Sequence, residues 1–374
     1  MKKLGFGTMR LPKTEETVQD SFDMEQICQM MDYFLEQGFI YVDTAYMYHN
    51  YKSEIAVREA LVKRHPRDSF LLADKLPVAM ISGRDEYVRV FDEQLEKCGV
   101  DYFDYYLVHD LTRTSYPGVQ EADAFGFLMQ KKAEGKIRHL GMSCHDNAEF
   151  IDKVLTEHPE IEFVQLQINY IDWENEGIQS RKNYETCVKH GKKVIVMEPV
   201  KGGSLATVPE EAEKLMKGYA PDASIASWAV RYAASLENVM IVLSGMSTFE
   251  QMKDNTSYMV DFKPLNDDER EIIAKAVDIV SSSFAVPCTG CRYCVNHGDG
   301  CPMNIAIPEY FAIYNNIHQY GRGWGVIQAY KRTAAEFGRP SDCIECGQCE
   351  EYCPQHIPIR EKLKEVPTFD SNPF

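Results

Sequence analysis

Eight of the twelve cysteines in this 374-residue chain lie between residues 288 and 353. In the segment CIECGQCEEYCP (343–354) the cysteines are spaced by two, two and three residues and are followed by a proline. This spacing is typical of a 4Fe–4S site, because three thiolates must reach three corners of one small cube from a single loop. An earlier triplet, CTGCRYC (288–294), repeats the two-two spacing, and Cys301 follows after a gap of six residues. The sequence therefore predicts two iron–sulfur half-sites.

The fourth cysteine of such a run binds the other cluster in two-cluster ferredoxins. This cross-pairing predicts one 4Fe–4S cluster on Cys288, Cys291, Cys294 and Cys353, and a second on Cys343, Cys346, Cys349 and Cys301. Two helix-like segments, 307–321 and 325–338, separate the half-sites, so the tail resembles an α-helical ferredoxin domain. A single cluster stays an alternative because of the long gap before Cys301. Zinc is a second alternative, although zinc sites usually pair two C-x2-C hooks.

The preceding part of the chain alternates short apolar runs with longer amphipathic ones. The apolar runs predict strands at 4–9, 41–45, 70–76, 103–110, 137–144, 163–169, 193–199 and 240–246. Eight strands alternating with helices favour a (β/α)8 TIM barrel over an open doubly wound sheet, which stays the alternative. Segment 264–283 predicts a closing helix with Asn266 as its N-cap, and 281–283 a hinge. We therefore expect a barrel domain over 1–280 and a small, mainly α-helical iron–sulfur domain over 281–374.

Four polar residues fall at the ends of the first four predicted strands, where a parallel barrel carries its catalytic groups. They are Asp43, Tyr48, Lys75 and His109. Taken singly, each has an ordinary structural explanation, such as a helix cap or a buried core histidine. Together they suit carbonyl reduction, in which a phenol with a pKa of about 10 needs help to donate a proton. A buried ammonium lowers that pKa if a carboxylate holds the ammonium charged. Asp43 would thus anchor Lys75, and Lys75 would tune Tyr48 as the general acid, with His109 donating to the substrate oxygen.

The motifs VDTAYMY (42–48), DK (74–75) and LVHD (107–110) resemble the aldo-keto reductase superfamily, and the resemblance runs from residue 5 to residue 255. It implies this catalytic tetrad and a small-molecule carbonyl substrate. It also implies NADPH or NADH as hydride donor, bound at the barrel mouth without the G-x-G-x-x-G fingerprint. The cofactor positions that it implies are Gly7, Thr8, Met9, Asp43, Ser143, Cys144, Gln165, Met197, Pro199, Val200, Gly202, Gly203, Leu205, Gly245, Met246, Ser247, Gln251 and Asn255.

Several of these positions depart from the family pattern. Cys144 stands where many members have Asn, and Met197 replaces an aromatic residue that stacks on nicotinamide. Gly245 and Gln251 stand where basic residues often bind the 2′-phosphate of NADPH, so NADH is at least as plausible a cofactor. Gly202 and its neighbour are expected to let the backbone approach the pyrophosphate.

The formal net charge of −17 argues against a nucleic-acid partner. No apolar stretch suits a signal peptide or a membrane span, so we expect a cytoplasmic protein with no membrane partner. A carbonyl reductase whose clusters exchange electrons with a flavoprotein or ferredoxin partner ranks first among the functions. The same reductase with structural or oxygen-sensing clusters ranks second, and an electron carrier on an inactive barrel ranks third.

Overall fold

The computed structural model describes residues 1–15, 18–320 and 324–369 of the chain. These residues form two compact units, which we call the barrel unit (Met1–Val200 with Ala226–Asn266) and the cysteine unit (Lys201–Ile225 with Asp267–Phe374). Within the described residues, no helix combines the length and the apolar character that crossing a membrane requires.

The domain boundary predicted between residues 280 and 281 stays a prediction. Helix α12 (Asp267–Ser282), predicted as the closing helix of the barrel, belongs to the cysteine unit, where it lies against α9 (Glu210–Tyr219). The helix begins directly after Asn266, and it includes the first two of the three residues predicted as a hinge. An amphipathic helix does not reveal from its own sequence which neighbour covers its apolar face, so the contact with α9 was not predicted.

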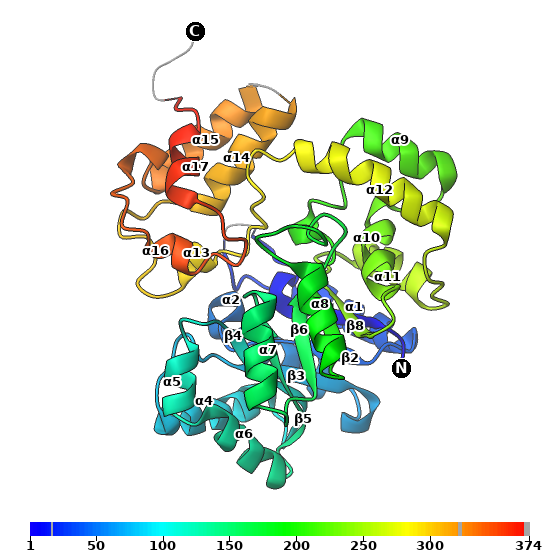
Figure 1. Ribbon diagram of the computed structural model, residues 1–374, viewed down its shortest axis with the longest axis vertical. Coiled ribbons are helices and arrows are strands. Elements are labelled where there is room, and N and C mark those ends of the chain that lie inside the picture. Colours follow the sequence, from blue (N-terminus) through cyan, green and yellow to red (C-terminus); the bar gives the residue numbers. More distant parts are fainter. Residues whose placement is uncertain (16–17, 321–323, 370–374) are drawn as a thin grey trace. The chain divides into compact units, whose positions relative to one another are not determined.

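The barrel unit contains the predicted closed parallel barrel, with strands in sequence order and β8 bonded to β1 (Figure 1). Its strands are β1 (Leu4–Gly7), β2 (Tyr41–Asp43), β3 (Leu71–Leu76), β4 (Phe103–Leu111), β5 (Ile137–Cys144), β6 (Phe163–Gln167), β7 (Lys193–Met197) and β8 (Val239–Ser244). Strands of a parallel sheet covered on both faces read as continuous apolar runs, which explains why all eight were found from the sequence. Several predicted strands ran about two residues too long at their carboxyl ends, where the chain turns outward.

Helices surround these strands, and their sequences supply the expected end signals. The helices are α1 (Met24–Glu36), α2 (Tyr48–Tyr51), α3 (Ser53–Val57), α4 (Arg84–Cys98), α5 (Tyr116–Glu121), α6 (Ala124–Ala133), α7 (Ala148–Glu157), α8 (Ser180–Lys189), α10 (Ile225–Ala234) and α11 (Phe249–Met259). The side chain of Asp23 caps α1 by accepting a hydrogen bond from the Gln26 amide at 3.0 Å. Helix α4 ends at Gly99, whose φ of 68° is the left-handed conformation that glycine adopts at low cost.

Alternating residues of the strands fill the inside of the barrel. One buried apolar cluster contains Tyr41, Ala73, Leu107, Phe163 and Ile195, each from a different strand. Successive side chains of a strand point to opposite faces, so residues two positions further along face the same side as these cluster members. The apolar cluster therefore lies below the carboxyl ends of the strands, and the polar residues that follow it sit at the barrel mouth.

The cysteine unit is mainly helical, as predicted, and its described residues contain no β-strand. Besides α9 and α12 it holds α13 (Tyr293–Asn296), α14 (Ile307–Tyr320), α15 (Trp324–Glu336), α16 (Gln348–Glu351) and α17 (Ile359–Glu365). Helices α14 and α15 lie side by side, and their buried residues Tyr310 and Tyr330 meet edge to face at 5.4 Å in the apolar core of this unit. Tyr310 thus belongs to the core of the cysteine unit. Gly321, predicted to end the first of these two helices, lies outside the described residues.

Candidate active site and cysteine pockets

The structure brings the four predicted tetrad residues together at the barrel mouth. Lys75 is completely buried (0% exposed), and its Nζ donates hydrogen bonds to Asp43 Oδ1 and to the Thr44 carbonyl oxygen, both at 2.6 Å. The same Nζ lies 5.2 Å from the centre of the Tyr48 ring. The rings of Tyr48 and His109 meet edge to face, with 6.2 Å between their centres. These are the four side chains that the sequence grouped, and the Thr44 carbonyl is a partner that sequence reasoning missed.

Burial and charge act against each other on Tyr48. Burial is the largest influence and raises the pKa of the phenol above its ordinary value, while the Lys75 ammonium acts in the lowering direction. Burial also lowers the pKa of Lys75, but Asp43 and Tyr48 more than compensate, so the net pKa of Lys75 is raised and the ammonium stays charged. Lys75 thus acts in the expected lowering direction, although the net pKa of Tyr48 is raised. Lys75 opposes a larger effect of burial, and Tyr48 keeps its proton at neutral pH.

The turn that follows Tyr48 has an unusual backbone. His49, Asn50 and Tyr51 have φ values of 52°, 53° and 64°, the left-handed region that residues other than glycine rarely adopt. The two ring nitrogens of His49 lie 2.6 Å and 3.0 Å from the carbonyl oxygens of Gln19 and Thr8. We infer that His49 holds the turn that presents Tyr48. Sequence reasoning missed it, because a left-handed run without glycine has no sequence signature.

The residues expected to meet the nicotinamide share the face of the strands that carries the tetrad. Ser143 Oγ accepts a hydrogen bond from the Asp110 amide at 2.8 Å, and Gln165 Nε2 donates to Met197 Sδ at 3.6 Å. The side-chain oxygen Oε1 of Gln165 is buried without a hydrogen-bond partner. Such an oxygen fits the amide N–H of a nicotinamide carboxamide, because a buried acceptor left unpaired is costly. Burial raises the pKa of the Cys144 thiol, so this cysteine keeps its proton and is a poor nucleophile.

The loop after β8 uses most of its polar groups internally. Gln251 Oε1 accepts from the Ser247 amide at 2.7 Å, and Asn255 Nδ2 donates to Ser244 Oγ at 3.0 Å. A Cβ built on Gly245 would lie 3.4 Å from the Cβ and the Cδ of Arg10, so the Arg10 side chain lies over this glycine. Arg10 thus supplies a cation where Gly245 and Gln251 offer none. The sequence did not reveal it, because Arg10 comes from the opposite end of the barrel sequence.

Other predicted cofactor positions have structural explanations. The Thr8 hydroxyl donates to the carbonyl oxygen of Asp43 at 2.9 Å, so it supports the tetrad backbone. Met246 is buried. Gly7 is the last residue of β1, and Met9 lies in the short 3-10 turn that follows the strand. Pro199 and Val200 end the first segment of the barrel unit.

The glycines after β7 lie in the cysteine unit. Gly202 has a φ of 66°, and a Cβ there would come within 2.3 Å of the Thr289 carbonyl oxygen. Glycine is thus required at position 202 because the backbone packs against the loop that carries Cys288 and Cys291. The expected contact was with a pyrophosphate. The adjacent Lys201 donates to Gln355 Oε1 at 3.2 Å. Gly203 (φ 102°) and the buried Leu205 continue this segment.

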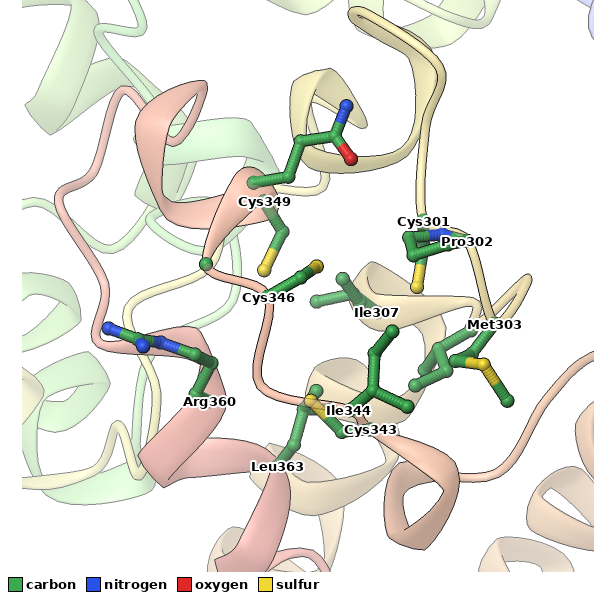
Figure 2. Close-up of a pocket in the computed structure, with 13 residues that line it drawn as sticks. Cys301, Pro302, Met303, Ile307, Cys343, Ile344, Cys346, Cys349, Arg360 and Leu363 are labelled. Carbon is green, nitrogen blue, oxygen red and sulfur yellow. The ribbon is translucent and has the colours of Figure 1, made fainter.

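The eight clustered cysteines line two separate pockets, four in each. One pocket is lined by Cys288, Cys291, Cys294 and Cys353, and the other by Cys301, Cys343, Cys346 and Cys349. Figure 2 shows the sulfur atoms of Cys301, Cys346 and Cys349 pointing into the second pocket, which apolar side chains such as Ile307 and Leu363 complete. The grouping is the one that cross-pairing predicts. In the described part of the chain, no group of three or more His, Cys, Asp or Glu side chains is arranged to hold a single metal ion, so the fit of these pockets to a cluster rests on the kind and number of the donors that line them.

The chemistry of the two pockets fits iron–sulfur clusters. Each offers four thiols and mostly apolar surroundings, the donor set that such clusters take. Burial raises the pKa of Cys294, and the neighbouring thiols of the same pocket raise it further. The pKa of Cys349 is raised to about 12, by burial first, then by Glu350 and the other cysteines of its pocket. These thiols ionise only if a positive metal centre replaces their protons.

The fold and the two sites define the class: a (β/α)8 barrel with a polar tetrad at its mouth, linked to a helical domain with paired cysteine pockets. The profile of the Aldo/keto reductase family matches residues 3–278, and that of the 4Fe-4S dicluster domain matches residues 287–357. The chain therefore belongs to the aldo/keto reductase family and carries a C-terminal 4Fe-4S dicluster domain. Both halves of the resemblance seen in the sequence are confirmed.

Similar proteins support the assignment of the barrel. An aldo-keto reductase from a Mycobacterium species is 32% identical over 142 residues, covering 37% of this chain and 45% of that protein. The NADPH-dependent alpha-keto amide reductase of Saccharomyces cerevisiae is 27% identical over 201 residues, covering 53% and 61%. The chain thus spans about half the length of these curated relatives.

Solved structures show the same fold. An aldo-keto reductase from Bacillus halodurans in its holo form has a TM-score of 0.60 at 24% identity, covering 73% of this chain and 91% of that one. An aldo-keto reductase from Klebsiella pneumoniae in complex with NADPH has a TM-score of 0.59 at 19% identity, covering 74% and 91%.

Proposed function

We propose that this protein is an NADPH-dependent oxidoreductase that interconverts small-molecule carbonyl compounds and their alcohols. The observation that carries the proposal is the buried Lys75 ammonium, held by Asp43 at 2.6 Å and placed beside the ring of Tyr48. A buried ion pair next to a buried phenol is costly to maintain, and perturbed groups of this kind concentrate at active sites.

In this proposal Tyr48 is the general acid. The phenol keeps its proton until a carbonyl oxygen at the barrel mouth gains negative charge, and it then donates that proton while Lys75 stabilises the phenolate. His109 donates a hydrogen bond to the same oxygen and orients the substrate. A bound nicotinamide supplies the hydride that the carbonyl carbon receives.

NADPH is the preferred cofactor in this proposal. The yeast relative is named as NADPH-dependent, and Arg10 lies over Gly245 at the loop where a 2′-phosphate would need a cation. The buried Oε1 of Gln165 would accept a hydrogen bond from the carboxamide N–H of the nicotinamide. Ser143, which is also buried, lies beside Gln165 on the neighbouring strand β5.

The two cysteine pockets would each hold one 4Fe–4S cluster. Such clusters supply single-electron transfer, and we infer that they exchange electrons with an external flavoprotein or ferredoxin. Cys346, the exposed cysteine among the eight ligands, leaves the second pocket open to such a partner. A passive structural or oxygen-sensing role for the clusters is the second candidate, because nicotinamide releases electrons in pairs.

The proposal is tested by replacing the Tyr48 hydroxyl. Tyr48→Phe should lower carbonyl-dependent oxidation of NADPH by at least about 100-fold, because general acid catalysis of this kind contributes about two to four orders of magnitude. NADPH binding, measured by fluorescence titration, should change little. The matched control is Tyr46→Phe, because the Tyr46 hydroxyl donates to Glu93 on α4 at 3.1 Å and should be dispensable for turnover. Wild-type turnover in Tyr48→Phe would contradict the proposal.

A further inference from the structure

Two buried carboxyl groups that do not belong to the tetrad lie directly behind it. Glu54 in α3 and Asp74 in β3 are both 0% exposed. Asp74 directly precedes Lys75, so its side chain leaves the opposite face of the strand, away from the barrel interior. Two adjacent buried carboxyl groups are stable only when at least one of them is protonated.

Asp74 holds the backbone of Lys75 in place. Its Oδ1 accepts a hydrogen bond from the Lys75 amide at 2.8 Å, and Gln94 Nε2 donates to the Lys75 carbonyl oxygen at 3.0 Å. Gln94 is itself fixed, because its Oε1 accepts from the Tyr106 hydroxyl at 2.5 Å. The pairing of β2 with β3 stops at Ala73, two residues before Lys75. Beyond the end of that strand pairing, the side chains of Asp74 and Gln94 hydrogen-bond to the backbone of Lys75.

Glu54 and Asp74 are close enough to affect each other's proton binding. Burial, followed by the charge of Asp74, holds the pKa of Glu54 well above its ordinary value, and burial raises the pKa of Asp74 to about 7. A hydrogen bond from protonated Glu54 to Asp74 raises the pKa of Glu54 and lowers the pKa of Asp74. The ammonium nitrogen Nζ of Lys97 lies 3.5 Å from Glu54 Oε2, but it lies closer to Glu93 Oε1, at 2.7 Å. Glu54 is therefore the carboxyl group that favours its protonated form, while the pKa of Asp74 lies at about 7.

We propose that Asp74 is a positioning residue of the tetrad, which fixes the backbone of Lys75, and that its buried neighbour Glu54, by sharing a proton with Asp74, helps to set the charge behind Lys75 and Tyr48. This inference rests on the proposed reductase function. The ionised form of Asp74 makes Tyr48 a weaker acid, and its protonated form removes that effect. Reduction therefore slows as the pH rises through about 7.

The titratable groups that act on the pair, or whose protonation the pair affects, come from several elements. They are Asp43 in β2, Tyr48 in α2, Lys75 in β3, Lys97 and Cys98 in α4, and Tyr106 in β4. Burial raises the pKa values of Cys98 and Tyr106 well above their ordinary range, so both stay neutral near pH 7. Asp74 is thus the member of this group whose charge changes there.

The test compares Asp74→Asn with Glu54→Gln. The asparagine retains an oxygen that accepts from the Lys75 amide but cannot ionise, whereas the glutamine imitates the protonated form that Glu54 already has. In the wild type, kcat for carbonyl reduction should fall about fivefold between pH of about 6 and about 8, the size expected for one buried charge at this range. Asp74→Asn should abolish the fall, and Glu54→Gln should preserve it. A fall that persists in Asp74→Asn, or disappears in Glu54→Gln, overturns the inference.

A second measurement does not depend on turnover. Because the folded-state pKa of Asp74 is raised, its protonated form stabilises the fold fully below the unfolded pKa, and this stabilisation is lost as the pH rises toward about 7. From about pH 5 to about pH 8, the melting temperature of Asp74→Asn should therefore rise by several degrees relative to that of the wild type. If the melting temperatures of Asp74→Asn and the wild type change with pH by the same amount, proton sharing between Glu54 and Asp74 is overturned. A wild type that melts as expected but reduces no carbonyl contradicts the proposed function instead.

Discussion

The Lys75–Asp43 pair shows how much a single buried contact decides in this site. Lys75 has two acceptors at 2.6 Å, Asp43 Oδ1 and the Thr44 carbonyl, and both are shielded from water. In such surroundings the loss of one partner leaves an uncompensated charge, which is more costly than the loss of the pair. In the proposed mechanism, the charge that acts on Tyr48 is therefore also a charge on which the stability of the barrel depends.

Lys75→Met should destabilise the protein by about 3–5 kcal/mol, because it leaves Asp43 buried without its cation. The double variant Asp43→Asn/Lys75→Met should recover most of that loss, since no buried charge remains. Neither variant should reduce carbonyl compounds at a measurable rate. Chemical denaturation followed by an NADPH oxidation assay checks both statements. Recovery of activity together with stability in the double variant would show that Lys75 serves the fold alone.

Arg10 leads to a prediction about cofactor choice. If its guanidinium pairs with the 2′-phosphate, Arg10→Ala should raise the KM for NADPH about tenfold, the effect of one lost charge-assisted contact of about 1.4 kcal/mol. The KM for NADH, which lacks this phosphate, serves as the internal control and should change less than about twofold. An equal rise for both cofactors would assign Arg10 to loop packing.

At the scale of elements, the interior of the barrel depends on one close approach between β5 and β6. A Cβ built on Gly141 would lie 2.4 Å from the Phe163 ring, so this strand position admits no larger residue unless the ring moves. We expect Gly141→Ala to destabilise the barrel by about 1–3 kcal/mol through overpacking. Adding Phe163→Leu should restore part of that loss. Gly218→Ala in α9, where nothing lies within 4 Å, is the control and should leave stability unchanged or raise it by up to about 1 kcal/mol.

The elements also show where the sequence sufficed and where it did not. Strand positions and the Asp43, Lys75 and His109 strand ends follow from apolar runs and their alternation, which are local properties of the chain. The left-handed turn after Tyr48 and the Glu54–Asp74 pair depend on contacts between distant segments of the chain. No local sequence pattern therefore predicts them. The same reason explains α12, which was predicted as a helix while its contact with α9 was not foreseen.

At the scale of the whole molecule, the wiring of the two pockets can be tested one cysteine at a time. Cys353→Ser should remove the cluster that shares its pocket with Cys291, and it should spare the cluster on Cys346. Cys301→Ser should have the opposite effect. Each variant should retain about half of the iron and sulfide of the wild type when purified anaerobically, and electron paramagnetic resonance should show a single remaining cluster. Loss of the Cys346 cluster in Cys353→Ser would refute cross-pairing.

The central claim is that hydride passes from a nicotinamide to a carbonyl carbon while Tyr48 supplies the proton. The most direct measurement is an anaerobic single turnover with NADPH deuterated at the transferable position, followed by mass spectrometry of the alcohol. We predict that deuterium appears on the carbinol carbon in the wild type and that Tyr48→Phe forms almost no labelled alcohol. Unlabelled alcohol, with the electrons of NADPH found on reduced clusters, would contradict the account.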